Sequence, residues 1–227
     1  MGMNIIPGQD PGVMQVYNPL SRGTELIDIS DWTEGPMIDT EAIVAGTAIG
    51  AQQQLVLFSN LNHQLAPGGA KIRGIETTMT RPNQLPAAWS MIVTDIHLGI
   101  LSDQEIPIQQ SRLYNISIFA NFRVNNQRTE REAPMYYFSF PYGLAGAVSL
   151  DGALGPVERN LTANGAVAPS AQPKRVPVLV NDNMTFDMTV TFGRAIPAVI
   201  PAPAGPAACV TVYLTGLLSG YINKPLM

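Results

Sequence analysis

The sequence predicts an all-β protein, folded as one two-sheet β-sandwich, and three observations support this prediction. Apolar and polar residues alternate along several segments, which is the periodicity of a half-buried strand. No segment combines an apolar stripe at helical spacing with a capping signal, so helices are expected only as short turns at 40–49 and 144–150. The length of 227 residues suits a single sandwich with one core.

The clearest strand is expected at 184–192, where the sequence MTFDMTVTF alternates without interruption. One face carries Met184, Phe186, Met188, Val190 and Phe192, and the other carries Thr185, Asp187, Thr189 and Thr191. Similar alternation predicts strands at 113–124 and 210–219. Further strands are expected at 54–59, 71–80, 88–101, 135–140 and 175–180, with a weaker one at 24–29. Roughly eight or nine strands result, the number that a two-sheet sandwich or jelly roll requires.

Residues 1–21 are expected to form an extended N-terminal arm ahead of a single domain at 22–227. The segment mixes prolines and glycines with isolated apolar residues, so it cannot build a core of its own. It is either disordered or laid along another surface. Its apolar residues favour the second alternative, and they are the first candidates for an assembly interface: Ile5, Ile6, Met14, Val16 and Tyr17.

Two segments late in the chain are predicted to be long loops. Residues 143–173 are rich in small residues and lack periodicity, and residues 195–208 are rich in Pro and Ala. A structureless insertion of such length inside a compact domain is usually functional or ordered by a partner. We therefore expect both loops to contact neighbouring subunits. The remaining interface candidates lie in these loops or, for Tyr142, directly before the first of them: Tyr142, Leu144, Ile196, Val199 and Ile200.

The chain is poor in charge. Charged residues make up 13% of the sequence, against about 25% in an average soluble domain. A surface built from uncharged polar residues, Ala and Pro is expected to meet protein over much of its area, and the alternative is a neutral polar surface. The net charge of −4 and the scattered Lys and Arg residues argue against nucleic-acid binding.

We expect neither a membrane span nor a secretion signal in this sequence. No apolar run is long enough to cross a bilayer, so no membrane span is expected. The N-terminus has neither the basic start nor the apolar stretch of a signal peptide. We therefore expect synthesis in a cytoplasm.

The sequence offers little for catalysis or metal binding, since it contains two histidines and one cysteine. Asp95 and His97 project to one face of a predicted strand, as an acid–base pair or half of a metal site would need, but no third partner can be named. A structural role is the preferred interpretation for this pair and for His63, and Cys209 is expected to be a buried thiol. Motifs for nucleophiles, phosphate loops and metal sites are also absent, so we predict no enzyme, no cofactor and no metal.

Acidic residues gather between 28 and 41, at Asp28, Asp31, Glu34, Asp39 and Glu41. Carboxylate oxygens of this kind could coordinate calcium. Solvated acids ahead of the first long strands are the preferred interpretation, and calcium binding stays open as the alternative.

Aromatic residues are densest at 135–142. Tyr136, Phe138 and Phe140 share one face of a predicted strand and are expected in the core, whereas Tyr137 and Tyr142 are freer. The most charged stretch, 123–132, carries both signs. It is expected to be an exposed hairpin tip or a ring of ion pairs between subunits.

The C-terminal third resembles a known family. The order PVLVNDNMTFDMTVTF, a Pro- and Ala-rich loop, and then ACVTVYLTGLLSGYI is similar to the closing strands of viral jelly-roll capsid proteins. Their last strand often runs from alternating apolar residues into Leu-x-Gly, and here Leu214, Thr215 and Gly216 occupy that position. Together with the arm, the long loops and the charge-poor surface, this makes the chain look like a structural protein of a bacteriophage. The resemblance implies a jelly-roll-like antiparallel β-sandwich.

The resemblance also implies assembly within a virion. The expected partners are copies of the chain itself, as a trimer or lattice, and other virion proteins. A shell-forming capsid subunit and a decoration, cement or vertex protein are both possible, and the lack of a basic inner arm favours decoration. The alternative is a carbohydrate-binding jelly-roll module. A cupin enzyme would require several histidines on neighbouring strands, which this sequence does not supply. Host, oligomer symmetry and strand order stay open.

Overall fold

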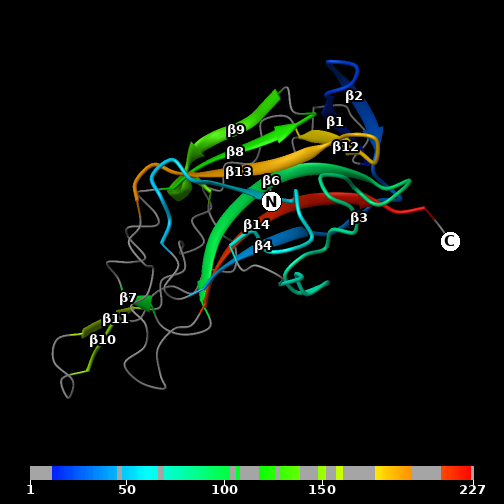
Figure 1. Ribbon diagram of the computed structural model, residues 1–227. Helices are drawn as coiled ribbons and strands as arrows, with labels where there is room; N and C mark the ends of the chain where they lie inside the picture. Colours follow the sequence, from blue (N-terminus) through cyan, green and yellow to red (C-terminus); the bar gives the residue numbers. More distant parts are fainter. Residues whose placement is uncertain are drawn as a thin grey trace.

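The computed structural model describes residues 12–44, 48–65, 69–102, 106–107, 118–125, 128–138, 148–151, 157–160, 177–195 and 211–225. Within these residues, all regular structure is β-strand apart from one turn of 3₁₀ helix, η1 (Met135–Tyr137). Figure 1 shows the strands arranged as stacked, curved sheets. The prediction of an all-β sandwich is confirmed.

The larger sheet has the strand order β2-β1-β12-β6-β14-β3, with β4 also paired to β14. Its strands are β1 (Val13–Asn18), β2 (Gly23–Asp28), β3 (Thr33–Glu34), β4 (Met37–Val44), β6 (Ser90–Ser102), β12 (Val178–Asn181) and β14 (Thr211–Asn223). The second sheet has the order β5-β13-β8-β9 and consists of β5 (Gln54–Leu57), β13 (Phe186–Phe192), β8 (Ile118–Val124) and β9 (Arg128–Pro134). A small third sheet lies beyond one end of the sandwich in Figure 1 and contains β7 (Ile106–Pro107), β10 (Val148–Asp151) and β11 (Val157–Asn160).

The antiparallel pairs of the sandwich are nested in chain order. β8 and β9 form a hairpin, and β6 pairs with β12 around it. β5 then pairs with β13, and β4 pairs with β14 outside them all. Successive nested pairs lie in alternate sheets, so the chain folds as one long hairpin that is rolled up on itself.

Alternating side chains fill the space between the sheets. The five apolar residues predicted to share a face at 184–192 are all at most 1% exposed. On β8, Ile118 and Phe122 are buried, whereas Phe119 on the other face is 38% exposed. On β14, Val212 and Leu214 enter the same core. The predicted faces are therefore confirmed for the described parts of these strands, and their apolar burial is the main source of stability.

Two glycines allow β14 to fit against its neighbours. Gly216 faces the second sheet, and a Cβ added there would lie 3.0 Å from Leu57 Cδ1 and 3.1 Å from Phe58 Cε2. Gly220 lies at a bulge, where the register with β6 shifts. A Cβ added at Gly220 would lie 1.8 Å from the carbonyl oxygen of Ile92. Both close approaches depend on the missing side chain.

Four predictions of secondary structure are wrong. The helical turns expected at 40–49 and 144–150 are contradicted by β4 and β10, which occupy 40–44 and 148–150. Instead of the strand expected at 71–80, the chain forms turns around Gly74, whose φ is +82°. Instead of a strand at 135–140, η1 follows Pro134, a residue that cannot donate to a strand ladder.

The larger sheet is mixed and not purely antiparallel, because β1 runs parallel to β12. β1 comes from the segment 1–21, and Val16 within it is 0% exposed. Two further strands, β10 and β11, fall within 143–173. Among the described residues, no helix is long and apolar enough to span a membrane.

Candidate functional site

Two carboxylates lie on the inner face of β4. Alternation directs Met37, Asp39, Glu41 and Ile43 toward the second sheet, and Met37 and Ile43 belong to the hydrophobic core. The side chains of Asp39 and Glu41 are 0% exposed. A charge removed from water destabilises the fold unless other groups compensate it, so both acids require partners inside the protein.

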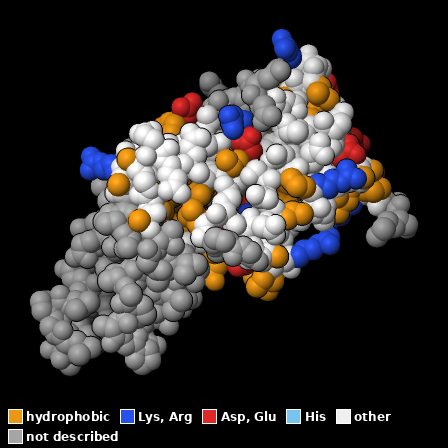
Figure 2. Space-filling view, viewed as in Figure 1, with side chains coloured by type: hydrophobic (Ala, Val, Ile, Leu, Met, Phe, Trp, Pro, Cys, Tyr) orange, Lys and Arg blue, Asp and Glu red, His pale blue; other side chains and the backbone are white. Residues whose placement is uncertain are grey.

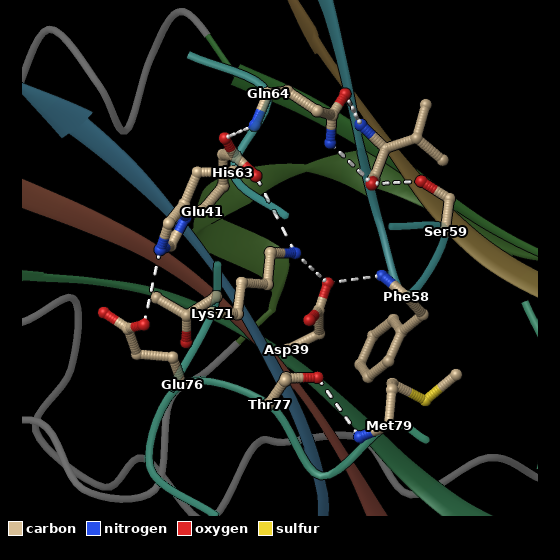
Figure 3. Close-up of polar contacts among 12 residues, drawn as sticks. Asp39, Glu41, Phe58, Ser59, His63, Gln64, Lys71, Glu76, Thr77 and Met79 are labelled. Atoms are coloured by element: carbon tan, nitrogen blue, oxygen red, sulfur yellow. Dashed lines mark hydrogen bonds and ion pairs between the residues drawn. The ribbon is translucent and has the colours of Figure 1, made fainter. Parts of the chain in front are cut away.

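Lys71 supplies a cation to both acids. Its Nζ lies 2.7 Å from Asp39 Oδ2 and 3.7 Å from Glu41 Oε2, and its side chain is also 0% exposed. Figure 3 shows the lysine beside β4 with its Nζ between the two carboxylates. We call Asp39, Glu41 and Lys71 the buried triad.

Backbone donors complete the surroundings of the buried triad. The N–H of Phe58 donates to Asp39 Oδ2 at 2.6 Å. The N–H groups of Gln64 and Leu65 donate to Glu41 Oε1, the latter at 2.9 Å. The two carboxylates therefore fasten the chain that follows β5 to the edge strand β4.

Burial decides the electrostatics of the two acids. It raises the pKa of Asp39 and of Glu41 above their usual values, and the nearby charge of Lys71 only partly opposes this effect. Glu41 Oε2 is buried and accepts no hydrogen bond, although it faces the lysine Nζ. The protonated forms of both acids are thus more accessible than they would be at a surface.

Side chains cover the free edge of β4. The N–H of Ala42 donates to His63 Nδ1 at 3.1 Å, and the N–H of Ile38 donates to Thr78 Oγ1 at 2.9 Å. Because His63 Nδ1 is an acceptor, the imidazole proton is on Nε2, which lies 3.3 Å from Glu76 Oε2. This edge is therefore closed to pairing with another chain, and His63 has a structural role.

The chemistry open to the buried triad is intramolecular. All three side chains are 0% exposed, so a molecule in solvent cannot contact them. In the described part of the chain, no three His, Cys, Asp or Glu side chains are grouped so that they could hold a metal ion.

The predicted acidic patch separates into two kinds of residue. Asp28, Asp31 and Glu34 are exposed, and Asp28 accepts hydrogen bonds from the N–H and hydroxyl of Ser30, which lower its pKa. For these three acids the prediction of solvated side chains is confirmed. For Asp39 and Glu41 that prediction is wrong, because both lie on the core face of β4.

The predicted interface residues have different surroundings. Met14 and Tyr17 are partly buried on β1, and Val16 packs in a small core cluster of the chain itself with Ile92 and Leu179. The remaining candidates lie outside the described residues: Ile5, Ile6, Tyr142, Leu144, Ile196, Val199 and Ile200. Cys209 also lies outside them.

Asp95 and His97 share the face of β6 that is opposite Ile96 and Leu98, two residues of the core. This is the arrangement that the sequence predicts. His97 is 6% exposed, and the carboxylate of Asp95 accepts a hydrogen bond from the Thr94 hydroxyl at 2.9 Å.

The structure describes parts of the aromatic stretch 135–142 and of the charged stretch 123–132. Tyr137 is 56% exposed and Phe138 is buried. The stretch 123–132 contains the connection between β8 and β9, as expected of a hairpin. Its Arg123 pairs within the chain, with Asp187 Oδ1 at 3.0 Å.

The buried triad is the feature that the sequence did not reveal. The alternation of the sequence could have indicated that the two acids are buried, since Asp39 and Glu41 occupy alternate positions between the apolar residues Met37 and Ile43. Comparison with known proteins adds no relative, because no family model, curated protein or solved structure matches the chain.

Proposed function

We propose that this chain is a structural subunit that assembles with copies of itself, as a shell or decoration protein of a virion. The observation that carries the proposal is a charge-poor surface with exposed apolar side chains. Charged residues are 13% of the sequence, and Ile72 and Ile75 are 56% and 74% exposed. On the face in Figure 2, apolar side chains lie exposed among uncharged and charged ones. Such a surface favours contact with protein.

The connectivity supports the jelly-roll interpretation of the fold. Eight strands make up four nested antiparallel pairs, and these alternate between the two sheets. A hairpin rolled up in this way corresponds to the two Greek keys of a jelly roll. Viral capsid proteins, lectins and cupins all use this fold, so the surface and not the topology carries the function.

The turn at residues 72–77, which we call the apolar turn, is the contact that we assign to a second copy of the chain. Lys71 and Thr77 are buried at its ends, and Glu76 Oε2 accepts a hydrogen bond from the N–H of Ile72 at 2.7 Å. The carbonyl of Ile72 also accepts from the N–H of Ile75 at 3.2 Å. The turn is therefore held in one conformation, and ordering it at an interface would cost little entropy.

Light scattering on the purified full chain across a range of concentrations tests the proposal. We expect a defined oligomer, and we expect Ile72→Asp with Ile75→Asp to shift it toward monomer. Thr24→Asp with Asn223→Asp is the matched control, because it adds the same charge at other exposed positions. A monomer at every concentration that also binds no virion component would contradict the proposal.

A carbohydrate-binding module is the second candidate, and the exposed Tyr137 ring favours it. Titration with a panel of soluble oligosaccharides would distinguish the two functions. Saturable binding that Tyr137→Ala abolishes, in a chain that stays monomeric, would support the carbohydrate module.

A further inference from the structure

We propose that Lys71 Nζ and Asp39 Cγ condense to an intramolecular isopeptide bond, with Glu41 as the group that relays the proton. This proposal does not depend on the function proposed above. It rests on three side chains that the fold brings together in the core without access to solvent.

The lysine nitrogen already contacts the carboxylate that it would attack. Lys71 Nζ is 2.7 Å from Asp39 Oδ2, and the two side chains come from separate elements, the edge strand β4 and the chain beside it. Holding two reacting groups in a fixed contact removes most of the entropy barrier to their reaction. The buried backbone around them keeps both groups in place, since the N–H of Phe58 fixes the same carboxylate oxygen at 2.6 Å.

The third group has a free oxygen in the required position. Glu41 Oε1 is held by the N–H groups of Gln64 and Leu65, while Oε2 accepts no hydrogen bond and lies 3.7 Å from Lys71 Nζ. Figure 3 shows Glu41 and Asp39 on opposite sides of the lysine nitrogen. A carboxylate that is oriented at one oxygen and free at the other is suited to accept and return a proton.

The reaction balances without any further reactant. A proton moves from Nζ to Asp39 Oδ2 along the existing hydrogen bond, which converts the ion pair to an amine and a carboxylic acid. The nitrogen lone pair then attacks Cγ and forms the C–N bond. Glu41 takes a proton from the nitrogen and returns it to the departing hydroxyl as the C–O bond breaks. One water molecule leaves, and Glu41 ends in its starting state.

The surroundings favour the neutral reactants and the neutral product. Phe58, Met37 and Met79 are core residues, and all are at most 2% exposed. Burial raises the pKa of both acids, so the protonated Asp39 that the reaction needs is accessible. The amide also replaces a buried ion pair, whose desolvation is unfavourable.

The other described ion pairs do not place a buried amine beside two carboxylates. Arg123 pairs with Asp187, but its side chain is 37% exposed and a guanidinium is always protonated. His63 and Glu76 contact each other near the surface, with exposed side-chain fractions of 7% and 13%. Only the buried triad unites an amine, a carboxyl carbon and a second carboxylate in the described core.

Intact-mass measurement of the folded, purified full chain tests the proposal. We expect a mass below the sequence mass by one water molecule, after allowance for N-terminal processing. Trypsin provides the map, because no Lys or Arg lies between Arg22 and Lys71. A linked chain resists cleavage after Lys71 and yields the peptide 23–73 lighter by one water, whereas an unlinked chain yields the peptide 23–71. Additional cleavage after Phe58 leaves the two halves of the linked peptide joined.

Three variants identify the reacting groups, each compared with its own sequence mass and checked for folding by circular dichroism. Lys71→Arg should show its full mass and tryptic cleavage after position 71. Asp39→Asn should lose ammonia in place of water, because the leaving group changes. Glu41→Gln should remain folded and unlinked. A wild-type chain at full mass, or a water loss that persists in Lys71→Arg, would overturn the proposal, and a linked Glu41→Gln chain would overturn the role of Glu41.

Discussion

Gly220 lies where β14 pairs with the bulge in β6, and replacing it with alanine should weaken the pairing of these two strands in the larger sheet. The added Cβ would lie 1.8 Å from the carbonyl oxygen of Ile92, 2.9 Å from its carbonyl carbon and 3.1 Å from the Thr94 nitrogen. All three atoms are backbone, so no rotamer change can relieve the clash, and the φ of +156° is rarely adopted by residues that carry a side chain. Strands β14 and β6 must separate locally.

Overpacking and backbone strain each cost about 1–3 kcal/mol. We therefore expect Gly220→Ala to lower the free energy of unfolding by about 3 kcal/mol, measured by urea denaturation with circular dichroism. Gly216→Ala should cost about 1 kcal/mol, because its closest contacts are the ends of side chains that can move. Gly50→Ala is the control, since its Cβ would meet only Gln53 Oε1 at 3.8 Å. Equal stabilities of the Gly220→Ala and Gly50→Ala chains would refute the described packing of β14 on β6.

Two further predictions concern the edge of β4. Glu41→Gln, which prevents the cross-link, should lower the free energy of unfolding by about 4 kcal/mol at pH 4, from the loop entropy of the closed segment 39–71. The folded-state pKa of Glu41 is raised above 4.5, so ionisation of this carboxyl in the core destabilises folded wild type as the pH rises, whereas the Gln variant has no such carboxyl. The difference in free energy of unfolding between wild type and variant should therefore narrow with rising pH. A constant difference in urea denaturation from pH 4 to about pH 7 would contradict this. His63→Ala should cost about 1–2 kcal/mol and speed hydrogen exchange at the Ala42 amide, and unchanged exchange would show that His63 does not cover the edge.

The parts of the fold that the sequence predicts are those where alternation and polarity agree. In 184–192 every core position is apolar and every outer position is polar, so strand, face and register of side chains follow from the pattern. β4 has the same geometry, but two of its core positions carry acids. The polarity of these two residues then contradicts their burial, and partners distant in the sequence compensate their charges, namely Lys71 and the backbone N–H groups of Phe58, Gln64 and Leu65. A long-range ion pair cannot be seen in local periodicity.

The segment after β5 was unpredictable for a related reason. Residues 71–80 are rich in β-branched Ile and Thr, which favour a strand, but Lys71 is held in the core by Asp39, and Thr77 forms a bridge to the same strand residue. The chain between these two anchors must turn, which leaves Ile72 and Ile75 outside. Their exposure therefore follows from the burial of Lys71, so the cluster inside the sandwich and the apolar turn on its surface are parts of one arrangement.

Hydrogen exchange of the full chain at increasing concentration tests most directly whether the apolar turn is an assembly contact. If copies of the chain meet there, amide exchange in residues 72–77 should slow as the oligomer forms, while exchange at the exposed turn between β1 and β2 stays constant. Identical exchange in residues 72–77 at all concentrations, with an oligomer present by light scattering, would place the contact elsewhere and contradict the account.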